Sequence, residues 1–144
     1  MKLSTKTRYG IRAVIELAEN YGRGPVQLKM ISKDQDISIK YLEQIISLLK
    51  SSGIVNSSRG AKGGYFLAKP PNKIKLSECF NCLEGPVATV ECVDNESYCA
   101  KTNKCVARDI WAEVEKAING VLDSITLQDM VERSQQNKPP LYEI

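Results

Sequence analysis

The chain has 144 residues, of which 42% are hydrophobic and 26% charged, a composition typical of a globular domain and unlike that of a disordered chain. It has no run of 18 apolar residues and no apolar leader at its start, so we expect a cytoplasmic protein without a membrane partner. The absence of histidine excludes Ser-His-Asp catalysis and every histidine-ligated metal site, and with them most hydrolases.

Charge is divided unevenly along the chain. Residues 1–75 hold 14 Lys and Arg against 5 Asp and Glu, a net charge of +9, whereas residues 76–144 hold 6 against 12, a net charge of −6. A basic half beside an acidic half favours contact between the first half and a polyanion such as nucleic acid. Chance clustering of solvated charges is the alternative interpretation.

The first half has the pattern of a winged helix. Apolar residues at helical spacing predict a helix over residues 4–21, with Ile11, Val14, Leu17, Ala18 and Tyr21 on one face. After a short helix at residues 27–35, Ser38 is a suitable N-cap for a helix that ends at Gly53 and carries the apolar stripe Leu42, Ile45, Ile46 and Leu49. Residues 54–58 and 65–68 can pair as strands around a basic, glycine-rich turn. Residues 1–75 are therefore predicted to form a winged helix-turn-helix domain.

The second half predicts a long helix that needs a partner. A short helix at residues 76–83 precedes a segment without periodicity, which ends at residue 103 and holds cysteines, and residues 135–144 should form a flexible tail. The region 104–134 should contain a helix to Ser124 and one or two further turns. Its apolar stripe consists of Ile110, Val114, Ile118, Val121 and Ile125. Because the short helices cannot cover this stripe, we expect a homodimer, with packing on its own winged helix as the alternative. The predicted fold class is mainly α with a small β-wing.

The second helix of the helix-turn-helix should enter the major groove of double-stranded DNA, with its N-terminal residues at the base edges. Gln44 can pair bidentately with adenine, and Glu43 can accept a hydrogen bond from a cytosine amino group. Cations of the wing turn and of the chain start can hold phosphates or enter the minor groove. The residues predicted to contact DNA are Lys2, Arg8, Ser38, Lys40, Tyr41, Glu43, Gln44, Arg59 and Lys62. A helical hairpin with an ordinary charged face is the alternative.

Five cysteines stand at positions 79, 82, 92, 99 and 105. A reducing cytosol would keep them free of disulfides. Cys92, Cys99 and Cys105 lie in one segment before the long helix, where three soft thiolates suit a metal site, either iron–sulfur or zinc. Cys79 and Cys82 lie three residues apart on a short helix, and buried packing is more common there than a zinc site.

The chain resembles the winged-helix regulators that include IscR, NsrR and CymR over nearly its whole length. The resemblance rests on residues 37–44 (Ile-Ser-Ile-Lys-Tyr-Leu-Glu-Gln), residues 55–65 (Val-Asn-Ser-Ser-Arg-Gly-Ala-Lys-Gly-Gly-Tyr) and the three cysteines. The cysteine segment and the Asp-Ile-Trp at residues 109–111 are most similar to IscR. This resemblance implies a homodimeric transcription regulator that binds a pseudo-palindromic operator, holds a [2Fe–2S] cluster on Cys92, Cys99 and Cys105, and controls genes of cluster biogenesis. Other members of the family hold a [4Fe–4S] cluster or none.

The chain departs from the family pattern in the cysteine segment. The interval between Cys92 and Cys99 is one residue longer than usual, and Arg108 stands where IscR-like members have a histidine ligand. The fourth ligand therefore cannot be carried over. The candidates are water, Glu91, Asp94, Glu96, Asp109, Thr102 and Glu43. We choose Glu43, because ligation there would link the cluster to the helix that reads DNA; Glu43 as a plain DNA contact is the alternative.

Three classes of function remain open. The leading interpretation is a cluster-sensing transcription regulator. The alternatives are a cluster-free regulator of the same fold that responds to thiols or a partner protein, and a structural zinc module that mediates interactions. A metalloenzyme is disfavoured, because the chain offers no histidine and no obvious carboxylate pair near the cysteines, so no catalytic residue is expected.

Overall fold

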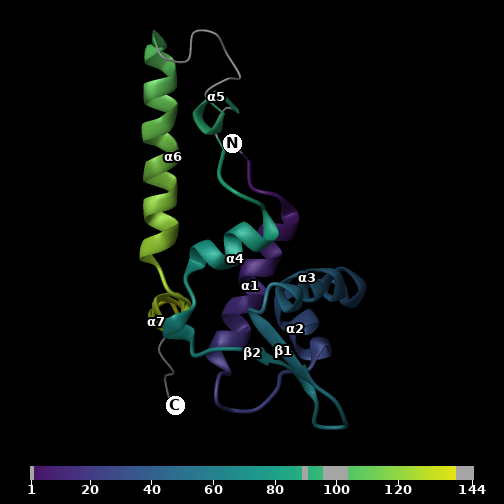
Figure 1. Ribbon diagram of the computed structural model, residues 1–144. Coiled ribbons are helices and arrows are strands. Elements are labelled where there is room, and N and C mark those ends of the chain that lie inside the picture. The colour runs from purple at the N-terminus through teal and green to yellow at the C-terminus, as the bar shows by residue number, and fades with distance from the viewer. Residues whose placement is uncertain (1, 89–90, 96–103, 139–144) are drawn as a thin grey trace.

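The computed structural model describes residues 2–88, 91–95 and 104–138, and of Cys92 and Asp94 only the backbone. Its elements are α1 (Thr5–Glu19), α2 (Leu28–Gln35), α3 (Ile39–Ser51), β1 (Val55–Ser58), β2 (Gly64–Leu67), the 3-10 turn η1 (Pro71–Lys73), α4 (Leu76–Leu83), α5 (Glu91–Asp94), α6 (Val106–Ser124) and α7 (Leu127–Gln136). The predicted fold class, mainly α with a small β-wing, is confirmed (Figure 1). Among the described helices, none is long and apolar enough to cross a membrane.

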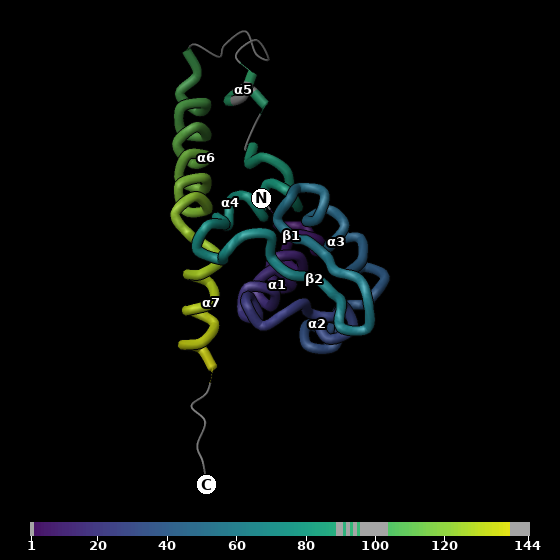
Figure 2. The backbone as a smooth tube through the Cα atoms, turned by 60° about the horizontal axis from the view of Figure 1, so that its bottom comes forward, coloured from purple at the N-terminus to yellow at the C-terminus, as the bar shows by residue number. Residues whose placement is uncertain are grey.

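Helix α1 stands at the centre of the fold. It packs against α2, α3 and β2 on one side and against α4 and α7 on the other (Figures 1 and 2). The core between these elements is one continuous apolar cluster, whose largest fully buried side chains include Leu17, Ile31, Leu42, Ile45, Ile46, Leu49, Leu67, Ile74 and Leu127. The apolar stripe predicted for the second helix of the helix-turn-helix therefore forms the centre of the core.

Both ends of α3 are set by local sequence. The hydroxyl of Ser38 accepts a hydrogen bond from the Tyr41 backbone N–H at 3.2 Å, as an N-cap does. At the other end, the Gly53 N–H donates to the Lys50 carbonyl at 3.0 Å and the Ile54 N–H to the Leu49 carbonyl at 3.1 Å. With Gly53 at φ 78°, these two bonds form a Schellman motif, and the predicted boundaries are confirmed.

The wing is an antiparallel hairpin tied to the body of the domain. β1 pairs with β2 so that Val55 lies opposite Leu67. The backbones of Val26 and Tyr65 exchange two hydrogen bonds of 2.8 Å, which join the base of the wing to the loop after α1. A Cβ atom at Gly63 would lie 2.3 Å from the Ser58 carbonyl oxygen, so the wing turn can close only with glycine at this position.

Helix α6 is anchored at its C-terminal end. The Leu76 N–H donates to the Ile125 carbonyl at 2.7 Å and the Leu127 N–H to the Ile74 carbonyl at 2.9 Å, which join the start of α4 to the α6–α7 junction. α7 then folds back on α1, while α6 packs on α4 and α5. The N-terminal half of α6 therefore projects away from the winged helix (Figures 1 and 2).

Three predicted details differ from the structure. Tyr21, expected on the apolar face of the first helix, is 42% exposed because α1 ends at Glu19. The segment expected to be irregular contains α5, a single turn too short to show periodicity. α7 has ten residues rather than one or two turns, and it continues to Gln136, two residues into the stretch predicted as a tail.

A buried carboxyl group lies at the contact between α1 and α2. Glu16 is 7% exposed, and its Oε1 accepts a hydrogen bond from Gln35 Nε2 at 3.3 Å. Its Oε2 has no hydrogen-bond partner among the described residues. Burial, together with a hydrogen bond to Asp34, raises the pKa of Glu16 from 4.5 to about 7. The ionised form of Glu16 is therefore unfavourable in the folded chain.

We expect Glu16 to make folding stability fall as the pH rises from about 5 to about 8. Because the folded chain binds this proton more tightly than the unfolded chain, the stabilisation is complete below pH 4.5 and is lost as the pH rises through about 7. Glu16→Gln should match the wild type at pH 5 and exceed its free energy of unfolding at pH 8 by up to about 3 kcal/mol. Urea unfolding at both pH values measures this. Glu43→Gln, at an exposed carboxylate, is the control, and identical pH trends in wild type and Glu16→Gln would refute the assignment.

Candidate nucleic-acid interface and cysteine segment

Helix α3 presents a polar face opposite its buried stripe. Lys40, Glu43 and Gln44 are exposed there, as predicted for a helix that reads bases. Ser38 is also exposed, but its hydroxyl already accepts the capping hydrogen bond, so its capacity to contact DNA is reduced. Tyr41 is half-buried, because its ring meets that of Tyr9 edge to face at 6.1 Å between centroids.

A chain of contacts joins α1, α2 and α3 behind this polar face. The Arg12 guanidinium lies 5.5 Å from the centroid of the Tyr9 ring. It also donates to the Gln35 side chain at 3.1 Å and to the Gln35 carbonyl at 2.6 Å. These contacts fix the end of α2 and, through Tyr9 and Tyr41, the first turn of α3. Sequence reasoning missed Tyr9, Arg12 and Gln35, because no local pattern shows which residues of separate helices meet.

The start of α1 is held by a carboxylate from the end of α4. Glu84 accepts hydrogen bonds from the Ser4 hydroxyl at 2.6 Å, from the Ser4 backbone N–H at 3.4 Å and from the Thr7 hydroxyl. The hydroxyls of Ser4 and Thr7 lower the pKa of Glu84, so the carboxylate stays charged at the positive end of the helix. Lys2 and Arg8, both predicted to contact DNA, are exposed beside this end.

The wing carries its two predicted cations at the surface. Arg59 and Lys62 are both exposed in the turn between the strands. The side-chain amide of Gln27 donates to the Ala61 carbonyl at 3.3 Å, which holds the turn beside the start of α2. Gly60 adopts φ 104°, a backbone conformation that favours glycine. The structure therefore places the wing cations on a fixed turn next to the helix-turn-helix.

The cysteine segment lies at the start of α6, away from the wing. Cys105 is the N-cap residue of α6, with a half-exposed free thiol. Cys92 lies on α5, which packs against α6. Arg108, at the family's histidine position, donates to the Val93 carbonyl at 3.5 Å and so helps to join α5 to α6. The structure thus brings the helices that carry Cys92 and Cys105 together.

Two parts of the metal-site prediction cannot be read from these contacts. Cys99 lies outside the described residues, as do the alternative ligands Glu96 and Thr102, and no group of three potential ligands occurs among the rest. Glu43 lies on α3, whose packing partners include α1, α2, α4 and β1. Helix α3 is apart from α5 in both views (Figures 1 and 2). Within one protomer, the structure does not bring Glu43 to the cysteine segment.

The two cysteines of α4 belong to the packing of the domain. Cys79 is fully buried, and burial raises the pKa of its thiol to about 12. Cys82 is half-buried, with its Sγ 3.0 Å from the Ser52 hydroxyl and 3.4 Å from the Leu48 carbonyl. These contacts join α4 to the end of α3. The core role predicted for the pair holds fully for Cys79 and in part for Cys82.

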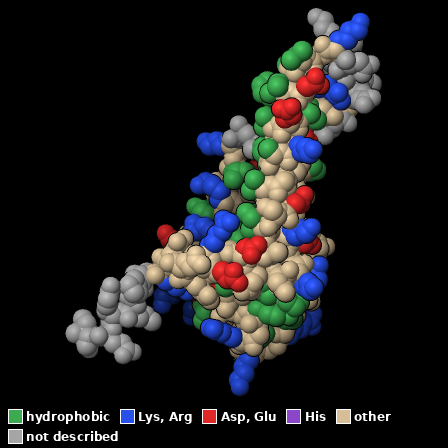
Figure 3. Space-filling model, turned by 90° about the vertical axis from the view of Figure 1, so that its left-hand side faces the viewer, with side chains coloured by type: hydrophobic (Ala, Val, Ile, Leu, Met, Phe, Trp, Pro, Cys, Tyr) green, Lys and Arg blue, Asp and Glu red, His purple; other side chains and the backbone are tan. Residues whose placement is uncertain are grey.

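The stripe predicted for dimerisation lies on the open side of α6. Ile110, Val114 and Val121 are 47%, 40% and 58% exposed, and Ile118 and Ile125 are half-buried. Hydrophobic side chains are visible along the projecting helix (Figure 3). The alternative, in which the stripe packs on its own winged helix, is therefore wrong for these three exposed residues.

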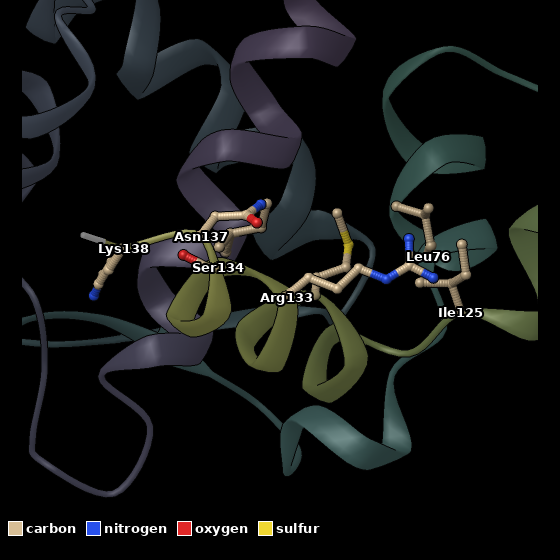
Figure 4. A pocket seen from close by; sticks show the side chains of 8 residues that line it. Leu76, Ile125, Arg133, Ser134, Asn137 and Lys138 are labelled. Atoms are coloured by element: carbon tan, nitrogen blue, oxygen red, sulfur yellow. The ribbon is translucent and has the colours of Figure 1, made fainter. Parts of the chain in front are cut away.

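A separate open cavity of about 530 Å³ lies between α1, α7 and the start of α4. Its floor includes Ile15, Leu76 and Met130, and Arg133 reaches across it towards Leu76 and Ile125 (Figure 4). α7 lies on the opposite side of α1 from α2 and α3 (Figures 1 and 2). No residue predicted to bind DNA or metal lines this cavity.

Comparison with known proteins agrees with this architecture. The Rrf2 family, described as "Iron-dependent Transcriptional regulator", matches residues 3–133. The regulator CymR of Bacillus subtilis (strain 168) is 42% identical over 130 residues, which cover 90% of this chain and 89% of CymR. IscR of Klebsiella pneumoniae (strain 342) is 36% identical over 131 residues, which cover 91% of this chain and 80% of IscR.

Solved structures show the same relationship. The structure of "the Global Cysteine Regulator of B. subtilis", CymR, aligns with a TM-score of 0.80 at 40% identity, covering 92% of this chain and 98% of CymR. The structure of T. potens IscR aligns with a TM-score of 0.80 at 39% identity, covering 99% of this chain and 94% of IscR. With the family match over nearly the whole chain and the winged helix in place, this protein belongs to the Rrf2 family of DNA-binding transcription regulators, which are not enzymes.

Proposed function

We propose that this regulator acts as a homodimer that reads a pseudo-palindromic operator with α3 and the wing. An iron–sulfur cluster on Cys92, Cys99 and Cys105 would control that binding in the cytoplasm, and the regulated genes would be those of cluster biogenesis. The observation that carries the proposal is the position of the cysteines. Two of them lie on adjoining helices at the start of α6, and the third lies in the segment between these helices.

The donor chemistry of this segment fits a cluster. Three thiolates are soft ligands that suit iron, and a [2Fe–2S] cluster would give the segment a group sensitive to oxidants and iron supply. The half-exposed Cys105 thiol is open to ligation, unlike the buried Cys79 thiol. A [4Fe–4S] cluster or zinc could use the same thiolates. Because α3 and α5 are apart within one protomer, Glu43 could serve as the fourth ligand only from a second copy or after a rearrangement.

A second candidate is a cluster-free regulator that responds to thiols. The CymR relative, 42% identical, is described in its solved structure as a global cysteine regulator, and CymR of Staphylococcus aureus has been solved in an oxidized form. Arg108 in place of a ligating histidine also favours this candidate. Both candidates share the DNA-binding half of the chain and differ only in what the cysteine segment binds.

Anaerobic purification should separate these candidates. The wild type should be coloured and hold iron and acid-labile sulfide, and Cys92→Ala, Cys99→Ala and Cys105→Ala should each lose them. Cys82→Ala is the matched control, because this half-buried thiol lies outside the segment and should leave the cluster intact. Ultraviolet–visible absorbance and metal analysis are the measurements. Bound zinc would indicate the structural zinc module, and metal-free protein with oxidation-sensitive DNA binding would indicate the thiol-responsive regulator.

The dimer proposal predicts that a charge on the open face of α6 separates the protomers. Val114→Glu should shift the protein from dimer to monomer at micromolar concentration, because it would bury an unpaired carboxylate between two apolar helices. Lys116→Glu, at an exposed position on another face of α6, should leave the dimer intact. Analytical ultracentrifugation measures both. A wild type that sediments as a 16.0 kDa monomer would contradict the dimer proposal.

The roles of wing and helix should separate in DNA binding. Arg59→Glu should weaken binding to selected and random DNA alike and flatten the salt dependence by about 0.9 per lost phosphate contact. Gln44→Ala should mainly lose discrimination at one base pair per half-site, about 1–3 kcal/mol. Fluorescence anisotropy over a range of salt concentrations measures both, with Lys116→Glu as a control away from the interface. Equal losses for both variants on both kinds of DNA would refute the assignment of roles.

A further inference from the structure

One apolar side chain on the DNA-facing end of α3 has no structural role. Ile39 is the first residue of α3 and is 45% exposed, whereas Leu42, Ile45 and Leu49 of the same helix are fully buried. It belongs neither to the core cluster nor to the partly buried hydrophobic residues packed against that cluster. The packing of the domain therefore does not explain an apolar residue at this position.

Local helix stability does not explain Ile39 either. A β-branched side chain is a poorer helix former than the straight-chain residues, and the first turn of a helix favours acidic side chains or proline. The N-terminus of α3 is already capped by Ser38, whose hydroxyl accepts from the Tyr41 N–H. An exposed isoleucine between the polar residues Ser38 and Lys40 is thus neither buried by the fold nor favoured by the helix.

We infer that Ile39 contacts the C5-methyl group of a thymine and so determines part of the sequence that this regulator reads. The inference rests on the proposed docking of α3 in the major groove. There, the N-terminal residues of a reading helix meet base edges, and an apolar side chain recognises the thymine methyl. Helical side chains also lean towards the N-terminus, which directs Ile39 towards the end of α3 that enters the groove.

The neighbour of Ile39 on the helix surface indicates where that thymine lies. Glu43 is four residues further on, so the two side chains share one face of α3, and both are exposed. A carboxylate in the major groove can accept from a cytosine amino group. Ile39 and Glu43 would therefore read two adjacent pyrimidines, one through its methyl group and one through its amino group.

Uracil substitution tests this inference, because deoxyuridine differs from thymidine only by the C5-methyl group. The probe is a duplex selected by the wild-type protein from a random-sequence pool, with each thymine replaced in turn. We expect one thymine per half-site at which loss of the methyl weakens wild-type binding about fourfold. Ile39→Ala should bind the thymine duplex about fourfold more weakly than the wild type and show no further loss with uracil at that position.

Leu48→Ala is the matched control, because Leu48 is an exposed apolar residue in the last turn of the same helix. This variant should keep the wild-type response to uracil, and thermal unfolding should show that both variants fold. A scan in which every uracil affects wild type and Ile39→Ala equally would overturn the inference while leaving DNA reading by α3 intact. A selection that enriches no sequence would instead overturn the proposed function, and the inference with it.

Discussion

The position of every functional segment depends on the close packing of α1 against α3 and α4. Gly10 stands where the three helices meet: a Cβ atom there would lie 2.5 Å from Leu83 of α4 and 3.3 Å from Ile45 of α3. Glycine within a helix costs about 1 kcal/mol relative to alanine. The close approach offsets this cost by allowing α3 to bury its whole apolar stripe, which turns its polar face outward.

The same helix joins the cysteine segment to the DNA-facing surface. Glu84, which directly follows α4, holds the start of α1 through Ser4 and Thr7, and the chain then continues into the cysteine segment. Tyr9, on the next part of α1, packs against Tyr41 in the first turn of α3. The base of the cysteine segment and the reading helix therefore share one support, as a regulator needs if a change in one is to bias the other.

Much of the fold could be predicted because its signals are local. The cap at Ser38, the stripe from Leu42 to Leu49, the stop at Gly53 and the glycine turn of the wing each lie within a few residues of the structure that they specify. The open apolar face of α6 was also predictable, because its periodicity extends over many turns. α5 was not, since four residues show no period.

The contacts that hold the site together could not be predicted from sequence patterns. Glu84 meets Ser4 across 80 residues, and Arg12 meets Gln35 across 23, so each pairing exists only once the helices have packed. The cysteine segment shows the opposite case. Its residue types predict metal chemistry on their own, but the choice of fourth ligand depends on a spatial neighbour that no spacing in the chain defines.

Chemical footprinting of the regulator on a selected duplex tests the central claim most directly, namely that α3 occupies the major groove and the wing lies along the adjacent minor groove. Dimethyl sulfate modifies guanine N7 in the major groove and adenine N3 in the minor groove. We predict protection of guanine N7 at the centre of each half-site and of adenine N3 beside it, repeated with an integral number of helical turns, about 10–10.5 base pairs each, between half-sites. Unchanged guanine N7 reactivity throughout a bound, sequence-selected duplex would contradict this account.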